Sequence, residues 1–436
     1  MHVRWGVLIP LLAAHLIGCS QETQSSECPE KGTGVTSVEG VFSGSKVPDY
    51  AVAGKQTVYP FTYPTQQTCD DTVTARLERA DGTEVPTESS AQRVDRTHGT
   101  VTLTPPESGV FQLKLTFEPG DRVASLNFIV AEDRSATHEE IPRWCTEVHR
   151  TAAGSLLCDD RVFRGGVQVA QITSPNHHAV AQNVVWEWQV SDGTLRRYVD
   201  DGSGALQLAP AVPLNGPCCA DPEQLVATED DVLVLDTELR RFEKTEVGLV
   251  SRGSSKYGEA HGGVTFFLGD KLLFRKDNLA FLVFQQETRS EVCVFSLDGE
   301  QVTLVPWNGP VADQHNGCQL LPGTHLGASD GGVWVQDFSE PASLRFLTPA
   351  SMGLVETASF PLPSPEVMDV NAATGVTPGP PEMKHGAERI LPRYVGGKLG
   401  FELYSPGSGY AFHDSDAALV TFTTSQSPGS TRVYVR

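Results

Sequence analysis

The stretch Asn183–Val199, NVVWEWQVSDGTLRRYV, decides the fold class of this chain of 436 residues. It contains an apolar run, an Asp-Gly pair that favours a tight turn, and a second segment that mixes apolar and charged residues. The same order of strand, turn and strand returns in three later stretches: Asp231–Lys244, Leu279–Val305 and Gly331–Leu347. Their starts are about 50 residues apart, a spacing typical of repeated four-stranded units. The sequence therefore predicts a repeated all-β structure.

The two strands of each repeat differ in character. Val232–Leu235 is a continuous apolar run, which predicts a strand buried between neighbouring sheets, whereas the second strand, with Arg240, Phe242 and Lys244, is more alternating and charged. This gradient and this spacing resemble β-propeller repeats in general, although a Trp-Asp signature and regular kelch glycines are missing. The resemblance implies a β-propeller-like domain over residues 151–436 with about six blades, five or seven being the alternatives. Another all-β architecture is the competing interpretation.

The segment before the repeats has a strand-and-turn pattern of its own. Short apolar or alternating runs occupy 56–63, 72–79, 99–103, 110–117 and 124–130, and turn-forming residues separate them. Within it, 106–111 followed by Leu113, Leu115 and Phe117 resembles the penultimate strand of bacterial immunoglobulin-like modules. The resemblance implies an immunoglobulin-like β-sandwich over residues 28–133. A charged segment, 134–150, is then expected to be a linker.

The N-terminus carries the most specific motif in the chain. Leu16, Ile17, Gly18 and Cys19 follow one positive residue and an apolar run of about 13 residues, which is the length of a signal peptide and too short for a membrane span. These residues resemble a bacterial lipobox. The resemblance implies that residues 1–18 are removed, that Cys19 carries lipid, and that 19–27 is a tether to a membrane. An ordinary secretory signal with an incidental Cys19 is the alternative.

The predicted location is the cell envelope, and the resemblance to Gram-negative lipoproteins points to the outer membrane because Ser20 rather than Asp follows Cys19. The formal net charge of −21 disfavours nucleic acid as a partner, since both carry the same sign. We therefore expect contact with a membrane through the lipid, and a protein or glycan as the ligand of the exported domain.

The remaining eight cysteines are expected to form disulfides, as exported chains usually do. The candidates are Cys28, Cys69, Cys145, Cys158, Cys218, Cys219, Cys293 and Cys318. Cys28 and Cys69 share the first domain, and Cys145 and Cys158 flank a hairpin-like segment. For the last four, we expect Cys218 and Cys219 each to reach one of Cys293 and Cys318, the alternative being a strained vicinal ring. Neither a metal site nor a cofactor is expected.

Motifs for nucleotide binding, the nucleophile elbow of hydrolases and the HExxH zinc motif are missing from the sequence. Histidines in loops are the remaining candidates for a ligand-binding face, because equivalent loops of a propeller converge near its axis. They are His177, His178, His261, His315, His385 and His413. Four tryptophans, Trp186, Trp188, Trp307 and Trp334, could stack on sugars or instead fill gaps between blades.

These observations favour a non-catalytic binding protein of the envelope, anchored by lipid. No catalytic residue is assigned, and whether the chain is an enzyme stays open. The first alternative is a carbohydrate-active enzyme, a hydrolase or lyase, which requires a carboxylate pair or a Tyr/His set gathered on the propeller face. The second is a structural subunit of an envelope assembly.

Overall fold

A computed structural model describes most of the chain after residue 39. It covers residues 40–436 apart from 43–46, 49, 65–71, 96, 119–121, 173–176, 190–193, 204, 210–223, 237, 247, 256–270, 287–288, 311, 313, 316, 330, 338–341, 362–368, 372–380, 416–418 and 425–428. The lipobox with Cys19, the cysteines Cys28, Cys69, Cys218 and Cys219, and His261 lie outside these residues. Over the described ranges all regular elements are strands, and no helix is long and apolar enough to cross a membrane.

The N-terminal region is a pair of sheets that share one core. One sheet has the order β2-β5-β4, and the other has the order β3-β6-β7 with β1 paired parallel to β7. Along β6, alternate residues from Phe111 to Phe117 are buried, as expected for a strand with one face on a core. The strands are β1 (Tyr50–Val52), β2 (Thr57–Thr62), β3 (Thr72–Arg79), β4 (Ser89–Arg93), β5 (His98–Leu103), β6 (Gly109–Glu118) and β7 (Arg122–Asp133). We call this region the sandwich; its immunoglobulin-like class stays a prediction.

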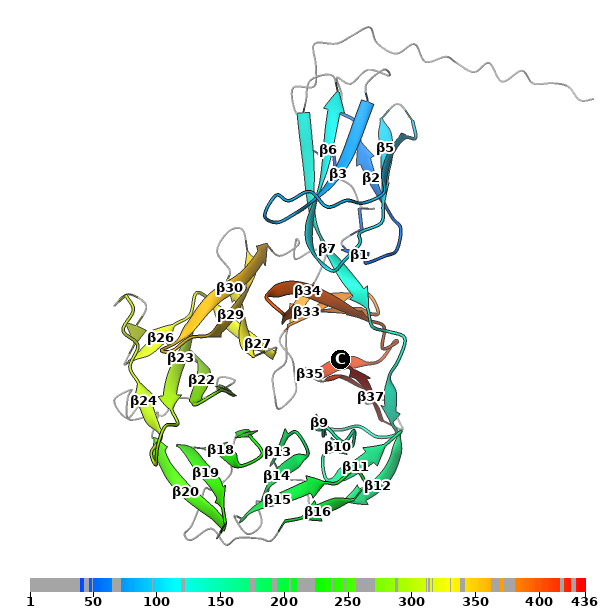
Figure 1. Cartoon of the computed structure of the whole chain (residues 1–436). Helices are drawn as coiled ribbons and strands as arrows, with labels where there is room; N and C mark the ends of the chain where they lie inside the picture. Colours follow the sequence, from blue (N-terminus) through cyan, green and yellow to red (C-terminus); the bar gives the residue numbers. More distant parts are fainter. Residues whose placement is uncertain are drawn as a thin grey trace, which may run out of the picture.

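The rest of the described chain forms a ring of seven four-stranded antiparallel sheets, the arrangement of a β-propeller (Figure 1). We number these sheets as blades in chain order. Blade 1 contains β9 (Val148–Arg150), β10 (Leu156–Cys158), β11 (Arg161–Arg164) and β12 (Val167–Gln171); blade 2 contains β13 (His177–Ala181), β14 (Val184–Gln189), β15 (Thr194–Asp200) and β16 (Leu206–Leu208); blade 3 contains β17 (Gln224–Ala227), β18 (Asp231–Leu235), β19 (Leu239–Thr245) and β20 (Gly248–Ser255).

The later blades follow the same order. Blade 4 contains β21 (Lys271–Lys276), β22 (Leu279–Gln286), β23 (Arg289–Ser296) and β24 (Thr303–Val305), with the hairpin β25 (Gln314–His315) and β26 (Cys318–Leu320) added to β23; blade 5 contains β27 (Thr324–Ser329), β28 (Gly332–Asp337), β29 (Ser343–Pro349) and β30 (Leu354–Pro361); blade 6 contains β31 (Asp369–Asn371), β32 (Glu382–His385), β33 (Glu388–Val395) and β34 (Lys398–Tyr404); blade 7 contains β35 (Ala411–Ser415), β36 (Leu419–Thr424), β37 (Ser430–Val435) and β8 (Glu139–Ile141).

The stretches that predicted the repeat are the middle strands of blades 2 to 5. In β18 all five residues are buried, whereas β19 buries only Leu239 and Phe242 of its seven residues. Each pair of neighbouring blades shares an apolar cluster: Val185 and Tyr198 of blade 2 pack with Leu157 of blade 1, and Leu419 and Val433 of blade 7 pack with Leu156 of blade 1. Burial of apolar surface between blades therefore holds the ring together on both sides of each sheet.

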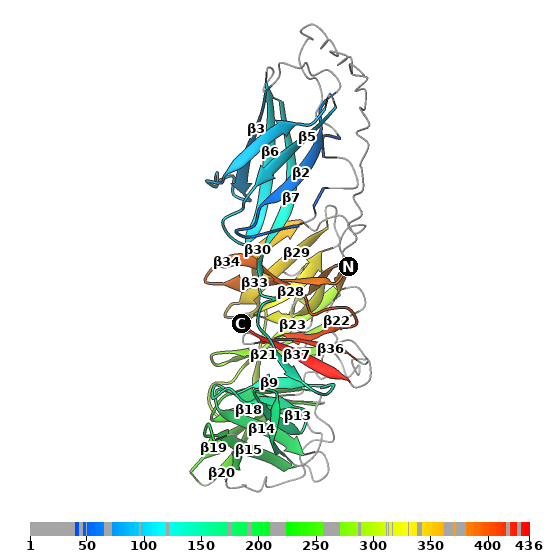
Figure 2. The same cartoon turned by 90° about the vertical axis from the view of Figure 1, so that its right-hand side faces the viewer.

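The sandwich joins the ring at the outer edge of blade 6. The end of β7 pairs in parallel with β34, so one eight-stranded sheet runs from the sandwich through blade 6. Ile129 and Ala131 of β7 enter the apolar cluster of blades 5 and 6, and the Ser108 hydroxyl bonds both the amide and the carbonyl of Phe401. Seen from the side, the sandwich extends in line with the ring (Figure 2).

Two expectations about the chain's organisation differ from the structure. The ring has seven blades, the larger of the two alternatives, rather than about six, because blade 1 is compact and blade 7 takes its fourth strand from elsewhere in the chain. That strand is β8, which lies within the expected linker 134–150 and pairs with β37. The segment expected to connect two domains therefore closes the ring, and β9 of blade 1 also begins inside it.

Two disulfides lie within the described residues. Cys145 bonds to Cys158, with Cα atoms 5.4 Å apart, in agreement with their positions around a short hairpin. Cys293 bonds to Cys318, with Cα atoms 4.5 Å apart, so the expectation that Cys218 and Cys219 reach these two is wrong. The physical reason is that the β25–β26 hairpin pairs with β23 and brings Cys318 beside Cys293.

Candidate functional site

A cluster of acidic and basic side chains lies between blades 1 and 2. Glu147, just before β9, contacts two imidazoles: His149 Nε2 is 2.9 Å from Glu147 Oε1, and His178 Nδ1 is 3.4 Å from Glu147 Oε2. His149 lies on β9 and His178 on β13, which are the first strands of the two blades. One glutamate therefore bridges two neighbouring blades.

The local fold places Glu147 firmly. The amides of Thr146 and Glu147 donate hydrogen bonds to Asp159 Oδ1 at 2.8 and 3.0 Å, and the amide of Asp159 donates to the Glu147 carbonyl at 3.0 Å. Asp159 has a φ of 52° in the turn between β10 and β11, a conformation that Asp tolerates better than most residues. The Cys145–Cys158 disulfide joins the same two segments. These contacts hold the backbone of Glu147 in place independently of His178.

A second carboxylate, from blade 2, completes the cluster. Glu187 of β14 lies with its Oε1 3.9 Å from His178 Nε2, and the Tyr198 hydroxyl donates a hydrogen bond of 2.7 Å to Glu187 Oε2. The side chains of His178 and Glu187 are fully buried, whereas those of Glu147 and His149 are 11% and 15% exposed. Of these four side chains, only those of Glu147 and His149 are open to solvent.

The electrostatics of the cluster favour an ionised Glu147. Burial by itself would raise the pKa of this carboxyl, but the charges and hydrogen bonds of His149 and His178 outweigh burial and lower the pKa to about 2. At neutral pH the cluster therefore holds a carboxylate that is desolvated and bound to imidazoles on two blades. Its evident effect is to link those blades.

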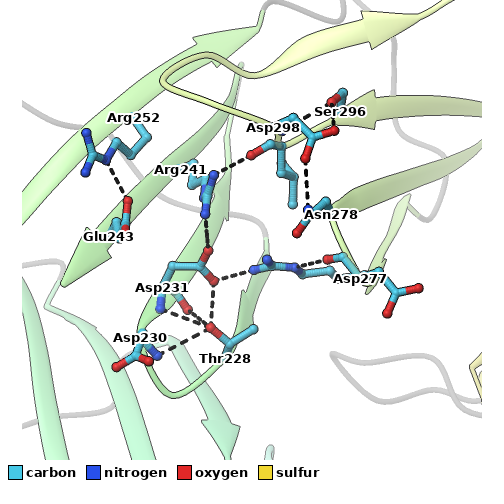
Figure 3. Close-up of polar contacts among 12 residues, drawn as sticks. Thr228, Asp230, Asp231, Arg241, Glu243, Arg252, Asp277, Asn278, Ser296 and Asp298 are labelled. Carbon is cyan, nitrogen blue, oxygen red and sulfur yellow. Dashed lines mark hydrogen bonds and ion pairs between the residues drawn. The ribbon is translucent and has the colours of Figure 1, made fainter.

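A similar cluster links blades 2, 3 and 4 around Asp231, the first residue of β18 (Figure 3). The Thr228 hydroxyl donates to Asp231 Oδ1 at 2.7 Å, Arg241 Nε donates to Oδ2 at 2.9 Å, and Arg275 of blade 4 forms an ion pair with Oδ1. Trp186 of blade 2 donates from its indole to the Thr228 carbonyl at 2.8 Å. Burial opposes ionisation of Asp231, but these partners hold its pKa below the usual range.

These clusters join sheets rather than assemble a metal site. Within the ranges given above, no group of three or more His, Cys, Asp or Glu side chains is arranged so that it could hold a metal ion. Three of the tryptophans proposed to stack on sugars, Trp186, Trp188 and Trp334, are fully buried between blades. Their rings fill space in the ring of blades and are closed to a ligand.

The predicted ligand-face histidines that the structure describes belong to three different blades. His177 and His178 begin β13 in blade 2. His315 lies on β25 beside blade 4, where its Nδ1 is 2.8 Å from Glu291 Oε1, and burial raises the pKa of Glu291 in spite of this contact. His385 lies on β32 of blade 6 and its ring faces Tyr50 of the sandwich at 5.4 Å. The side chain of His413 lies outside the described residues.

The structure thus brings His178 to residues that the sequence analysis did not select. Glu147 and His149 alternate along the start of β9 and therefore point to the same side. A usable signal was present at Glu187, because a glutamate inside the apolar run of β14 needs a buried partner. That the predicted histidines share one ligand-binding face of the ring stays a prediction.

Comparison with known proteins gives only distant likenesses. No family model and no curated protein matches the chain. Among solved structures, a quinoprotein alcohol dehydrogenase-like protein of Bacteroides thetaiotaomicron is 9% identical with a TM-score of 0.34. The match covers 91% of this chain and 93% of that protein. A periplasmic gluconolactonase of Pseudomonas aeruginosa is 12% identical with a TM-score of 0.35, over 68% and 96% of the two chains. AztD of Citrobacter koseri is 12% identical with a TM-score of 0.31, over 81% and 76%.

At these identities and TM-scores the likenesses carry no argument about family or activity. The β-propeller arrangement rests on the strand pairing, on the apolar clusters between neighbouring blades and on the ring seen in Figure 1.

Proposed function

We propose that the protein is a lipid-anchored protein of the cell envelope in which the sandwich holds the ring in a fixed orientation, and that the ring binds a protein or glycan without altering it chemically. The observation that carries the proposal is the eight-stranded sheet that continues from the sandwich into blade 6. The β7–β34 pairing spans two residues, and the burial of Ile129 and Ala131 against blades 5 and 6 adds to it, which supports a fixed junction rather than a flexible linker. Attachment at the outer edge of one blade keeps the sandwich off both faces of the ring (Figures 1 and 2).

Three further features support an exported, anchored protein. The lipobox ends at Cys19, two disulfides are formed in the described part of the chain, and the net charge of −21 suits a soluble exported body. Two or more acyl chains on Cys19 would make membrane attachment nearly permanent. We also propose that the sandwich is immunoglobulin-like, because its two sheets, β2-β5-β4 and β3-β6-β7, have the strand order B-E-D and C-F-G of that fold.

Membrane attachment is tested with the Cys19→Ala chain, and Ser20→Ala serves as the matched control. We expect Cys19→Ala to lose metabolically incorporated palmitate and to leave the membrane fraction or stay unprocessed, whereas Ser20→Ala keeps both label and location. Retention of label and membrane fractionation by Cys19→Ala would overturn the anchor.

The binding role is tested by crosslinking in intact envelopes and on a glycan array with the mature protein. Capture of a defined glycan or protein that is recovered chemically unchanged is the expected result. Recovery of a cleaved or eliminated glycan would replace the binding role with the alternative activity, a carbohydrate-active hydrolase or lyase. One constant stoichiometric partner would instead favour the structural subunit.

The enzyme alternative has one observation in its favour, which is the gathering of Glu147, His149, His178, Glu187 and Tyr198 between blades 1 and 2. Two carboxylates and a tyrosine around one imidazole are groups that proton transfer uses. Against it stands the complete burial of His178 and Glu187. A glycan turnover that disappears in Glu187→Gln and in Tyr198→Phe, both folded, would establish this alternative.

A further inference from the structure

One tryptophan of the ring is presented to solvent instead of being buried between blades. Trp144 is 50% exposed, and within the part of the chain that the structure describes it is the one aromatic residue among the exposed large hydrophobic side chains. It lies in the segment between β8 and β9, where blades 7 and 1 meet. Leaving so much of an indole in water forgoes the stabilisation that its burial would give.

The backbone on both sides of Trp144 is fixed. The Thr431 hydroxyl donates to the Arg143 carbonyl at 2.9 Å and accepts from the Cys145 amide at 3.1 Å, and Cys145 is part of a disulfide. Gly429 packs directly on Trp144, since a Cβ at position 429 would lie 3.0 Å from the Trp144 Cβ and 3.3 Å from its amide nitrogen. The exposed indole is therefore held on an ordered backbone, so that a ligand would have little left to order.

Charged side chains lie directly beside Trp144. Arg143 Nε donates to the Trp144 carbonyl at 3.5 Å, and the other guanidinium nitrogens lie 3.5 Å from Asp159 Oδ2 and 3.8 Å from Asp160 Oδ1. Arg161 adds a contact of 3.9 Å to Asp160. These contacts are longer than ordinary hydrogen bonds, so the Arg143 guanidinium keeps donor capacity for the hydroxyls of a ligand. We call Arg143, Asp159, Asp160 and Arg161 the polar group.

Charge and apolar area select the class of ligand for this surface. The polar group has two guanidiniums and two carboxylates, and Glu147, whose amide bonds Asp159, adds a third carboxylate. This excess of negative charge, on a chain of net charge −21, disfavours phosphates, acidic sugars and anionic lipids. One indole supplies at most about 250 Å², far less than the about 800 Å² per partner that a stable protein interface buries.

A neutral sugar satisfies both limits. The C–H groups on one face of a pyranose ring stack on an indole, and the hydroxyls at its edge bond to charged side chains. We propose that Trp144 and the polar group form a subsite for an uncharged pyranose unit of a glycan. This inference rests on the proposed binding function and narrows its ligand from a protein or glycan to a neutral glycan.

The test uses the mature protein and four neutral probes, which are cellotetraose, tetra-N-acetylchitotetraose, maltotetraose and mannotetraose. Binding is measured by titration calorimetry and by quenching of tryptophan fluorescence with acrylamide. At least one probe is expected to bind and to protect Trp144 from acrylamide, and this protection should be missing in Trp144→Phe. Trigalacturonate, an acidic comparator, is expected to bind at least about tenfold more weakly than that probe.

The variants separate the platform from the polar group. Trp144→Ala should weaken binding by about tenfold or more, and Trp144→Phe, which keeps an aromatic face, should recover most of the loss. Arg143→Gln should also weaken binding by about tenfold, because it removes charged donors. Leu208→Ala is the control, since Leu208 is 54% exposed on β16 of blade 2, and it should leave the affinity unchanged. Circular dichroism confirms that each variant is folded.

Three results would overturn the subsite. They are no binding of any neutral probe by the wild-type protein, equal affinity of wild type and Trp144→Ala, and binding of trigalacturonate as tight as that of the neutral probes. The first result leaves a protein as the ligand of the ring, and the second leaves a glycan bound elsewhere on it. Failure of the subsite is therefore distinguishable from failure of the proposed binding function.

Discussion

The sandwich junction at blade 6 and the ring closure at blade 7 solve the same problem in different ways. Both add a strand to the outer edge of a blade, β7 to β34 and β8 to β37. At the junction only Glu132 and Asp133 of β7 pair with β34, and Ile129 and Ala131 of the same strand are buried in the apolar cluster of blades 5 and 6. At the closure the added strand has three residues, and the segment that follows it forms the Cys145–Cys158 disulfide and the ion pair of Arg143 with Asp159.

The difference shows that a short pairing can be supported in two ways. β7 pairs with β34 through two residues but is part of the folded sandwich, whereas β8 is a three-residue strand and the segment after it is held by a disulfide and ion pairs. Ordering so short a strand costs backbone entropy that its own pairs offset only in part. The polar group at the closure, Thr431, illustrates this: its hydroxyl accepts from the Cys145 amide at 3.1 Å and donates to the Arg143 carbonyl at 2.9 Å.

The largest expected effect comes from expressing the ring without β8 and β9. A chain beginning at Thr151, the boundary suggested by the sequence, lacks β8 and β9 and leaves Leu419 and Val433 uncovered. We expect it to show no cooperative thermal unfolding transition by circular dichroism. A chain beginning at Arg134 retains β8 and should fold with a lowered Tm. Equal Tm values for the chain that begins at Thr151 and the full chain would contradict a role of β8 and β9 in closing the ring.

Two substitutions on β7 test whether burial holds the junction between the sandwich and the ring. Ile129→Ala removes a side chain buried against blades 5 and 6 and should lower the free energy of unfolding by about 2 to 5 kcal/mol. Val123→Ala, at a position 43% exposed on β7, should change it by less than about 0.5 kcal/mol. Urea denaturation measures both. Similar losses from the two variants would show that β7 is not held by burial against the ring.

The contact of Glu147 between blades 1 and 2 is probed through pH. Since the pKa of Glu147 falls from an ordinary value of 4.5 to about 2 on folding, its ionised form stabilises the protein above about pH 4.5, and this contribution is lost as the pH falls towards 2. Glu147→Gln should therefore cost about 3 kcal/mol at pH 7 and progressively less below pH 5. The control, Glu140→Gln, removes an exposed glutamate of β8. A loss that does not change with pH would contradict the assigned contacts of Glu147 with His149 and His178.

The smallest expected effect is at Thr431. Thr431→Val leaves the Cys145 amide and the Arg143 carbonyl without this partner and should cost about 1 to 3 kcal/mol in urea unfolding. Thr357→Val, on the exposed outer strand of blade 5, is the control and should cost less than about 0.5 kcal/mol. If both variants unfold at the same urea concentration, the hydroxyl of Thr431 has no role in closure.

The sequence predicts those parts of the molecule whose signal is periodic. The buried run of β18 and the more charged strand β19 that follows it indicate the all-β class and the repeat, because burial on both faces of a sheet selects a continuous apolar run and partial exposure admits charged residues. β8 escapes prediction because Glu139, Glu140 and Ile141 have no pattern of their own, and only pairing with β37 makes them a strand. One blade was missed for the same reason, since blade 1 is built from strands as short as three residues.

The candidate site was predicted only in part. His178 was selected as a histidine in a loop, yet its partners Glu147 and Glu187 come from two blades and depend on the ring for their proximity. The pairing of Cys293 with Cys318 likewise follows from the β25–β26 hairpin folding back on β23, a tertiary contact that sequence spacing does not encode.

Amide hydrogen exchange at β8 tests the central claim most directly, namely that the segment following the sandwich is the strand that closes the ring. The account predicts that, in the full chain, those amides of Glu139–Ile141 that point to β37 in the antiparallel ladder are protected to within about tenfold of the amides of β37. Exchange of these amides at the rate of a free peptide, with β37 still protected, would contradict it.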